Sequence, residues 1–168
     1  SAYDSSAIMP EYLIKRRTAL LWSHEAMWDL DIQKQTSQWN TWNFRNNYTS
    51  AIKSTAAPMD FISEKDDFNG YHFLIAPACQ LIDSVLVKKW YQYVEKGGNL
   101  ILTCRTGQKD KNGHFFGTGW AGPIRSLIGA DIEFFDMLPP DFYGTVRYNK
   151  DDYKWNTWGE ILTPHPDT

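Results

Sequence analysis

Cys104 is the residue of this sequence that is best placed to act as a nucleophile. An apolar run, residues 99–103, delivers it to the end of an expected strand, and reactive groups in open parallel sheets lie beyond the carboxyl ends of the strands. A nucleophile elbow, however, needs small residues on both sides and a helix directly afterwards. Cys104 stands between Thr103 and Arg105, and a long polar loop follows. We therefore expect a structural thiol, with a catalytic cysteine served by His114 as the alternative.

The loop that follows Cys104 concentrates polar side chains. They are Arg105, Gln108, Lys109, Asp110, Asn112 and His114. One interpretation is a solvated loop. The other is a loop that reaches a neighbouring domain or subunit, because loops often carry binding residues. On the second interpretation, Arg105, Gln108 and Asp110 are candidate contacts.

Composition and charge exclude several classes of function. The 168 residues suit one domain with one sizeable core. A net charge of -3 gives no basic footprint for nucleic acid, and no apolar run is long enough to span a membrane. The two cysteines lack CxxC spacing and the four histidines are scattered, so we expect no metal site and no cofactor. The sequence does not indicate a cellular compartment.

Aromatic residues are unusually frequent, with 8 Trp, 9 Tyr and 9 Phe. Large aromatic side chains anchor cores and interfaces, and they also stack on sugars. The candidate anchors are Trp22, Trp28, Trp39, Trp42 and Trp120, with Glu25 as a further candidate contact beside the first two. For each Trp alone, burial in the core of its own domain is the expected position. A carbohydrate-binding module is the alternative, and it would require several coplanar, exposed Trp rings in a groove.

The elements that must position these residues alternate between strands and helices. Apolar runs predict strands at residues 18–22, 57–62, 71–76 and 99–103. Helices are expected after Ser23, across residues 39–52, and from Asp83 to the Gly97-Gly98 pair. This pattern predicts an α/β fold with a mostly parallel sheet and helices on both faces. A short helix at residues 123–130 is followed by the segment "DIEFFDM", residues 131–137, and strands near residues 144–149 and 158–162 form a late β-rich extension.

Several segments together resemble a known family. They are "ALLWSHEAMWDL", "GYHFLIAPACQLID", "YVEKGGNLILTCRTGQKDKNG", "GPIRSLIGADIEFFDMLPP" and "WGEIL". In this order they are similar to the second, trimerisation domain of glycoside hydrolase family 42 β-galactosidases. The Leu21, Trp22, Glu25 and Trp28 pattern contributes to that similarity. The resemblance implies a flavodoxin-like fold that is similar to class I glutamine amidotransferases without their catalytic set.

The resemblance implies a non-catalytic oligomerisation domain. In the family, two glutamates of an upstream (β/α)₈ barrel hydrolyse the terminal β-galactoside, and no catalytic residue is carried over to this chain. The expected partners are two further copies of the chain in a homotrimer and the barrel in cis. Residues 1–17 would be the connection from that barrel. Residues 18–168 would be the domain, truncated at its C-terminus. An active amidotransferase-like hydrolase using Cys104 is a further alternative.

Overall fold

The computed structural model describes residues 18–166. The predicted connection at residues 1–17 therefore lies outside the described residues. A four-stranded parallel sheet organises the first part of the chain, in the order β2-β1-β3-β4. The strands are β1 (Thr18–Leu21), β2 (Met59–Ile62), β3 (Phe73–Ala76) and β4 (Asn99–Leu102). The helices are α2 (His24–Ile32), α3 (Thr41–Ser54) and α4 (Ser84–Glu95).

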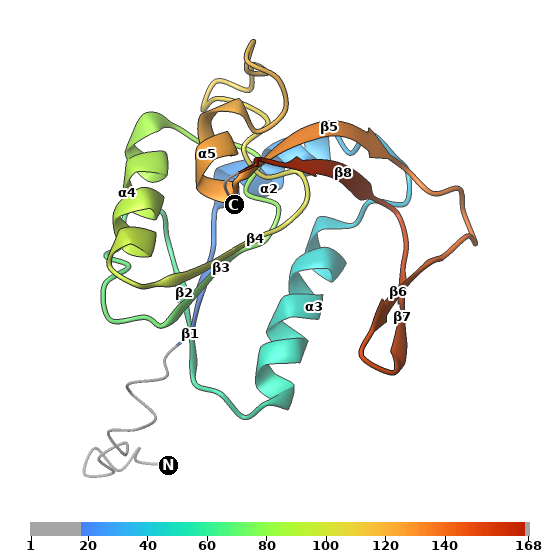
Figure 1. The fold of residues 1–168 in the computed structure, drawn as a ribbon, viewed down its shortest axis with the longest axis horizontal. Helices are drawn as coiled ribbons and strands as arrows, with labels where there is room; N and C mark the ends of the chain where they lie inside the picture. The colour runs from blue at the N-terminus through green and yellow to red at the C-terminus, as the bar shows by residue number, and fades with distance from the viewer. Residues whose placement is uncertain (1–17, 167–168) are drawn as a thin grey trace.

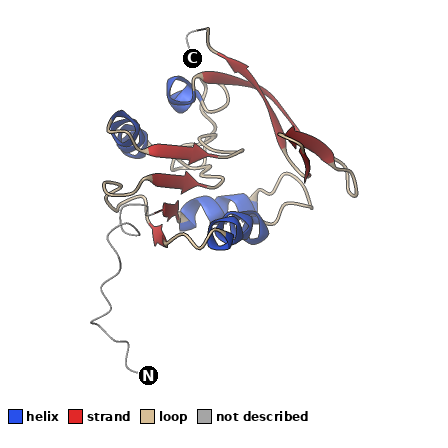
Figure 2. Cartoon of the chain, turned by 60° about the horizontal axis from the view of Figure 1, so that its bottom comes forward, coloured by secondary structure: helices blue, strands red, loops and turns tan. Residues whose placement is uncertain are grey.

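Helices cover both faces of this sheet, as predicted (Figures 1 and 2). Strand alternation directs Leu21 toward α4, where it shares a core cluster with Trp90. Leu20 points to the opposite face and packs in a cluster with Ile52 of α3 and Ile75 of β3. The α/β fold class is therefore confirmed.

The helix boundaries follow from capping. Asp83 Oδ1 accepts a hydrogen bond from the backbone N–H of Leu86 at 2.8 Å at the start of α4. After α4, Gly97 takes a φ of +88°, which a glycine adopts without the steric cost of a Cβ. Ser23 and Asn40 cap α2 and α3 in the same way as Asp83. Each of these three helices therefore begins at a side chain that satisfies an otherwise unpaired backbone N–H.

Strand β4 differs from the expectation of a strand buried on both faces. It forms an edge of the sheet, because β3 is its only neighbouring strand among the described residues. Ile101 is 42% exposed on the α3 side of the sheet, because α3 lies over β1 and reaches β3 only at Ile75. A groove of about 690 Å³ runs beside β4 and includes side chains of α5 (Arg125–Ile128) and β8 (Gly159–Pro164).

The late part of the chain contains two antiparallel ribbons. A 3₁₀ turn (Gly122–Ile124) and α5 lead into β5 (Ala130–Asp136), which pairs with β8. Between them, β6 (Gly144–Tyr148) pairs with β7 (Asp151–Trp155). The sequence predicted this β-rich extension but neither β5 nor β7 as a strand. The β6–β7 hairpin projects away from the helices and the parallel sheet (Figure 1).

Candidate interaction surface

An exposed group of aromatic side chains lies at the carboxyl ends of β1 and β2. Trp22 directly follows β1, and the register that pairs Leu20 with Phe61 places Phe61 on the α3 side of β2. Trp42 comes from the first turn of α3, while Trp28 belongs to α2. Three segments that are distant in sequence therefore bring Trp22, Trp42 and Phe61 into ring contact, while Trp28 is connected to them through the ring of His24. We call Trp22, Trp28, Trp42 and Phe61 the aromatic cluster.

The aromatic cluster is packed internally but open to solvent. The ring centroid of Trp22 lies 5.5 Å from that of Trp42 and 5.2 Å from that of Phe61. His24 connects Trp22 to Trp28, with centroid distances of 6.2 and 6.0 Å. Trp28 is nevertheless 63% exposed and Trp42 is 53% exposed. The expected burial of each Trp in its own core is thus wrong for these two residues.

Arg45 of α3 fixes the base of the aromatic cluster. Its guanidinium lies 4.5 Å from the ring centroid of Trp22, within the range of a cation–π interaction. It also donates hydrogen bonds to the carbonyl oxygens of Leu21 and Pro77. Burial lowers the pKa of Arg45 to about 10, so it stays charged at neutral pH. The orientation of Trp22 is therefore held by a buried cation that is itself anchored to the ends of β1 and β3.

The ring geometry does not match a sugar-stacking platform. The planes of Trp22 and Trp42 meet at 56°, and those of Trp22 and Phe61 meet at 83°. Among the described residues, the ring pair closest to parallel is Phe135 with Trp158, at 5°. Trp158 is only 6% exposed, so its face is not available to a ligand. The rings of the aromatic cluster are therefore not a set of coplanar platforms.

Glu25 lies at the edge of the aromatic cluster and is mostly exposed. Its carboxylate is 3.6 Å from the ammonium group of Lys111, which also contacts Glu64. Ion pairs with this exposure contribute little to stability. Glu25 is therefore an exposed carboxylate with one weak ion pair.

Arg105 and Gln108 are not part of an outward surface. They are 0% and 2% exposed. Arg105 donates to the backbone carbonyl oxygens of Gln33 and Lys34, each at 3.1 Å. Its guanidinium also lies 4.4 and 4.8 Å from the ring centroids of Trp39 and Trp158. These contacts join the end of α2 to the late ribbon, so Arg105 serves the interior of its own domain.

Lys109 pairs with Asp29 and forms a second connection between this loop and α2. The Lys109 ammonium is 2.8 Å from Asp29 Oδ2 and 2.7 Å from Gln33 Oε1. Lys109 is fully buried, and a buried charge is tolerated only when it is paired and hydrogen-bonded. Arg105 and Lys109 thus attach the loop after β4 to α2. These contacts explain why the loop contains so many polar residues.

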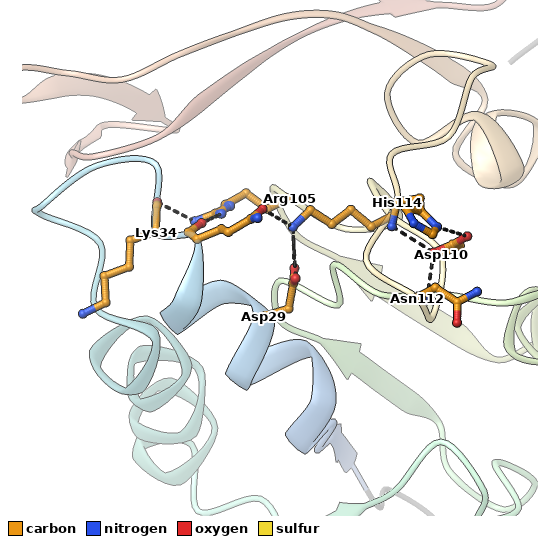
Figure 3. A network of polar contacts seen from close by, with 8 residues as sticks. Asp29, Lys34, Arg105, Asp110, Asn112 and His114 are labelled. Atoms are coloured by element: carbon orange, nitrogen blue, oxygen red, sulfur yellow. Dashed lines mark hydrogen bonds and ion pairs between the residues drawn. The ribbon is translucent and has the colours of Figure 1, made fainter.

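Asp110 organises the tip of this loop. Its Oδ1 accepts hydrogen bonds from the backbone N–H groups of Asn112 and His114, at 2.8 and 2.9 Å (Figure 3). The bond from His114 is the main reason why the pKa of Asp110 lies below its ordinary value. The loop therefore has a defined turn at its exposed end.

Cys104 lies in a setting that disfavours the thiolate. Burial raises its pKa to about 12, the charge of Glu160 adds to that rise, and Arg105 opposes it. The cluster around it consists of apolar side chains such as Phe44 and Phe135, and the His114 ring is 79% exposed on the outer loop. The environment is that of a structural thiol and not of an activated nucleophile.

Residues 16–168 match the family model for the β-galactosidase trimerisation domain. The chain belongs to this family. β-Galactosidase BgaH of Haloferax lucentense is 28% identical over 146 residues, which cover 87% of this chain and 22% of that protein. β-Galactosidase LacA of Lactobacillus acidophilus is 27% identical over 152 residues, or 90% of this chain and 23% of that protein. The trimerisation domain thus spans less than a quarter of the length of these relatives.

Solved structures agree with this membership. The β-galactosidase of the Antarctic haloarchaeon Halorubrum lacusprofundi superposes with a TM-score of 0.83 at 26% identity, covering 88% of this chain and 22% of that one. The β-galactosidase of Bacillus circulans sp. alkalophilus gives a TM-score of 0.84 at 20% identity, over 90% of this chain and 23% of that one. The second likeness concerns the fold alone.

Two residues of this site in the trimerisation domain were not predicted from the sequence, the buried Arg45 and the exposed Phe61. Arg45 follows Thr41 by four positions and precedes Ile52 by seven, and all three are buried on α3. That spacing marks one helix face, so the pattern could have placed Arg45 inward. Phe61 carries no comparable signal, because its exposure results from the position of β2 at the edge of the sheet.

The candidate anchor Trp120 is half-buried. Its ring packs edge-on against Phe135, with 4.8 Å between the ring centroids.

Proposed function

We propose that this trimerisation domain holds together the subunits of a β-galactosidase whose catalytic barrel lies in another part of the protein. The family membership and the β-galactosidase names of the relatives support this proposal. The chain spans only 22% of such a relative, and a (β/α)₈ barrel alone needs about 250 residues. Residues 1–17 would connect the barrel to the domain, and the galactoside would bind in the barrel.

The observation that carries the proposed role is the exposed aromatic cluster. Large exposed apolar patches on soluble proteins mark interaction sites, and buried Trp side chains with an Arg are frequent anchors of interfaces. Trp28 and Trp42 expose more than half of their surface, while Arg45 holds the neighbouring Trp22 in place. The cluster therefore has rigid aromatic anchors with a polar rim at Glu25, as a self-association surface requires.

The open edge of β4 supports a second part of the proposal, namely that further strands of this domain follow residue 168. Leu100 and Leu102 line the groove of about 690 Å³ beside that edge. The backbone N–H of Asn99 is bonded to His72 on the β3 side. By strand alternation, the backbone groups of Leu100 and Leu102 face the open side. Unpaired edges of this kind are normally covered in finished folds.

Sedimentation velocity on cluster variants tests the proposed role. Replacing Trp28 and Trp42 by Ser should weaken self-association of the chain at least about tenfold, because interface anchors of this type often carry more than 1.4 kcal/mol. The matched control is Val85→Ser, since Val85 is 67% exposed on α4, on the other side of the sheet. Equal association of both variants and the parent chain would remove the aromatic cluster from the interface.

A further inference from the structure

The β6–β7 hairpin has one apolar and one polar face. The register pairs Val146 with Tyr153 and Arg147 with Asp152, and side chains of paired residues share a face. Val146, Tyr148 and Tyr153 therefore line one face, where they are 53%, 67% and 53% exposed, and Asp151 shares this face opposite Tyr148 near the tip. On the opposite face, Arg147 and Asp152 form an ion pair at 2.7 Å. The hairpin is thus built to bury one side.

Within residues 18–166, that apolar face is not buried. The main packing partner of each hairpin strand is the other strand, and the hairpin extends from the body of the domain (Figures 1 and 2). An isolated two-stranded hairpin is at best marginally stable in water and needs a surface on which to pack. The apolar face therefore requires a partner outside the described part of this chain.

The most suitable partner is a second copy of the same chain. A projecting element that fits a different surface of an identical copy makes a heterologous contact, and such contacts close into rings. The hairpin lies inside the region that matches a trimerisation domain.

We propose that the β6–β7 hairpin is an intersubunit arm, whose Val146, Tyr148 and Tyr153 pack on the body of a neighbouring copy. This inference rests on the proposed role in assembly and adds the element that makes the contact. The arm does not replace the aromatic cluster. Stable interfaces bury at least about 1,000 Å², more than three hairpin side chains provide, so the arm and a body surface contribute together.

Photo-crosslinking of the full 168-residue chain tests the arm. A benzoylphenylalanine replaces Tyr153 in one variant and Lys154 in the other. Adjacent strand residues face opposite sides, so the probe at position 153 should give at least about fivefold more crosslinks between chains than the probe at position 154. In parallel, Val146→Lys should weaken self-association at least about tenfold, whereas Thr145→Lys on the polar face should leave it nearly unchanged.

The outcomes separate this inference from the proposed role in assembly. If the chain associates but positions 153 and 154 crosslink equally, the proposal of an intersubunit arm is overturned, while the proposed role in assembly stands. Crosslinks from position 153 to the same chain would also overturn it, because the hairpin would then fold back on its own domain. A chain that stays monomeric at every concentration would overturn both.

Discussion

At the scale of single residues, the thiol of Cys104 sits where its reactive form is strongly disfavoured. Burial and the charge of Glu160 raise its pKa to about 12. Only the thiolate is nucleophilic. The Glu160 carboxylate accepts a hydrogen bond from the backbone N–H of Arg105, and its negative charge also disfavours the thiolate of Cys104. The position of the cysteine at a strand end therefore does not by itself indicate a catalytic role.

Alkylation kinetics test this account of Cys104. The experiment uses the Cys79→Ser variant, in which Cys104 is the remaining cysteine of the chain. Labelling by iodoacetamide at neutral pH should be at least about a hundredfold slower than for a free thiol of pKa about 8.5, because so little thiolate is present. Rapid labelling at neutral pH would contradict the structural role and revive a catalytic one.

Glu160 gives a pH dependence of stability. Burial raises its pKa above the ordinary value of 4.5, against the opposing effect of its hydrogen bonds from Arg105 and Trp158. Between the unfolded and the folded pKa, the folded chain binds more protons, so its stability falls as pH rises through that window. Glu160→Gln removes this titration. We therefore expect the free energy of unfolding of the Gln variant, minus that of the parent chain, to increase as the pH rises from about 4 to 8. Urea denaturation of both proteins measures this difference.

Glu160→Ala is the contrasting substitution. Glu160 Oε1 accepts bonds from Arg105 N–H at 2.7 Å and from the Trp158 indole N–H at 3.1 Å. A Gln oxygen can accept both bonds, whereas Ala leaves two donors unpaired at a cost of about 1–3 kcal/mol. An Ala variant as stable as the Gln variant would show that these bonds are not made in solution.

At the scale of elements, the end of α4 depends on the backbone of Gly97. Its φ of +88° should make Gly97→Val cost about 1–2 kcal/mol, the strain of a left-handed conformation for a residue with a Cβ. Gly117→Ala is a suitable control, because a Cβ there would meet no atom within 4 Å. Urea denaturation of both variants checks this. Equal stability of the two would mean that the chain after α4 relaxes without strain.

The elements show how far the sequence alone determined the fold. The α4 helix was predictable because its cap, its periodic apolar residues and its terminal glycine agree. The β7 strand was not, since Asp and Lys have low strand propensity and β7 exists through its pairing with β6. The exposure of Trp28 and Trp42 also escaped prediction. Local sequence favours burial of large aromatic residues, whereas their actual position depends on which segments cover them.

At the scale of the whole molecule, we propose that assembly and hydrolysis belong to different parts of the protein. Retaining hydrolysis of a glycoside needs two carboxylates about 5–5.5 Å apart beside the scissile bond, and we place these two carboxylates in the proposed barrel. The purified chain should therefore release no product from a chromogenic β-galactoside. Turnover that disappears on replacing one of its own Glu or Asp residues would contradict this division of labour.

Sedimentation equilibrium of the unmodified chain, over about a hundredfold range of concentration, tests the central claim most directly. On the proposed role, the aromatic cluster and the arm make the contacts between copies, and a catalytic barrel in another part of the protein would add contacts that this chain cannot make alone. Without the barrel contacts, association is weaker, because the entropy cost of bringing the copies together stays the same. We therefore predict a weight-average mass that begins at 19.5 kDa and rises with concentration toward three copies. A mass that stays at 19.5 kDa throughout, or that saturates at two copies, would contradict the account.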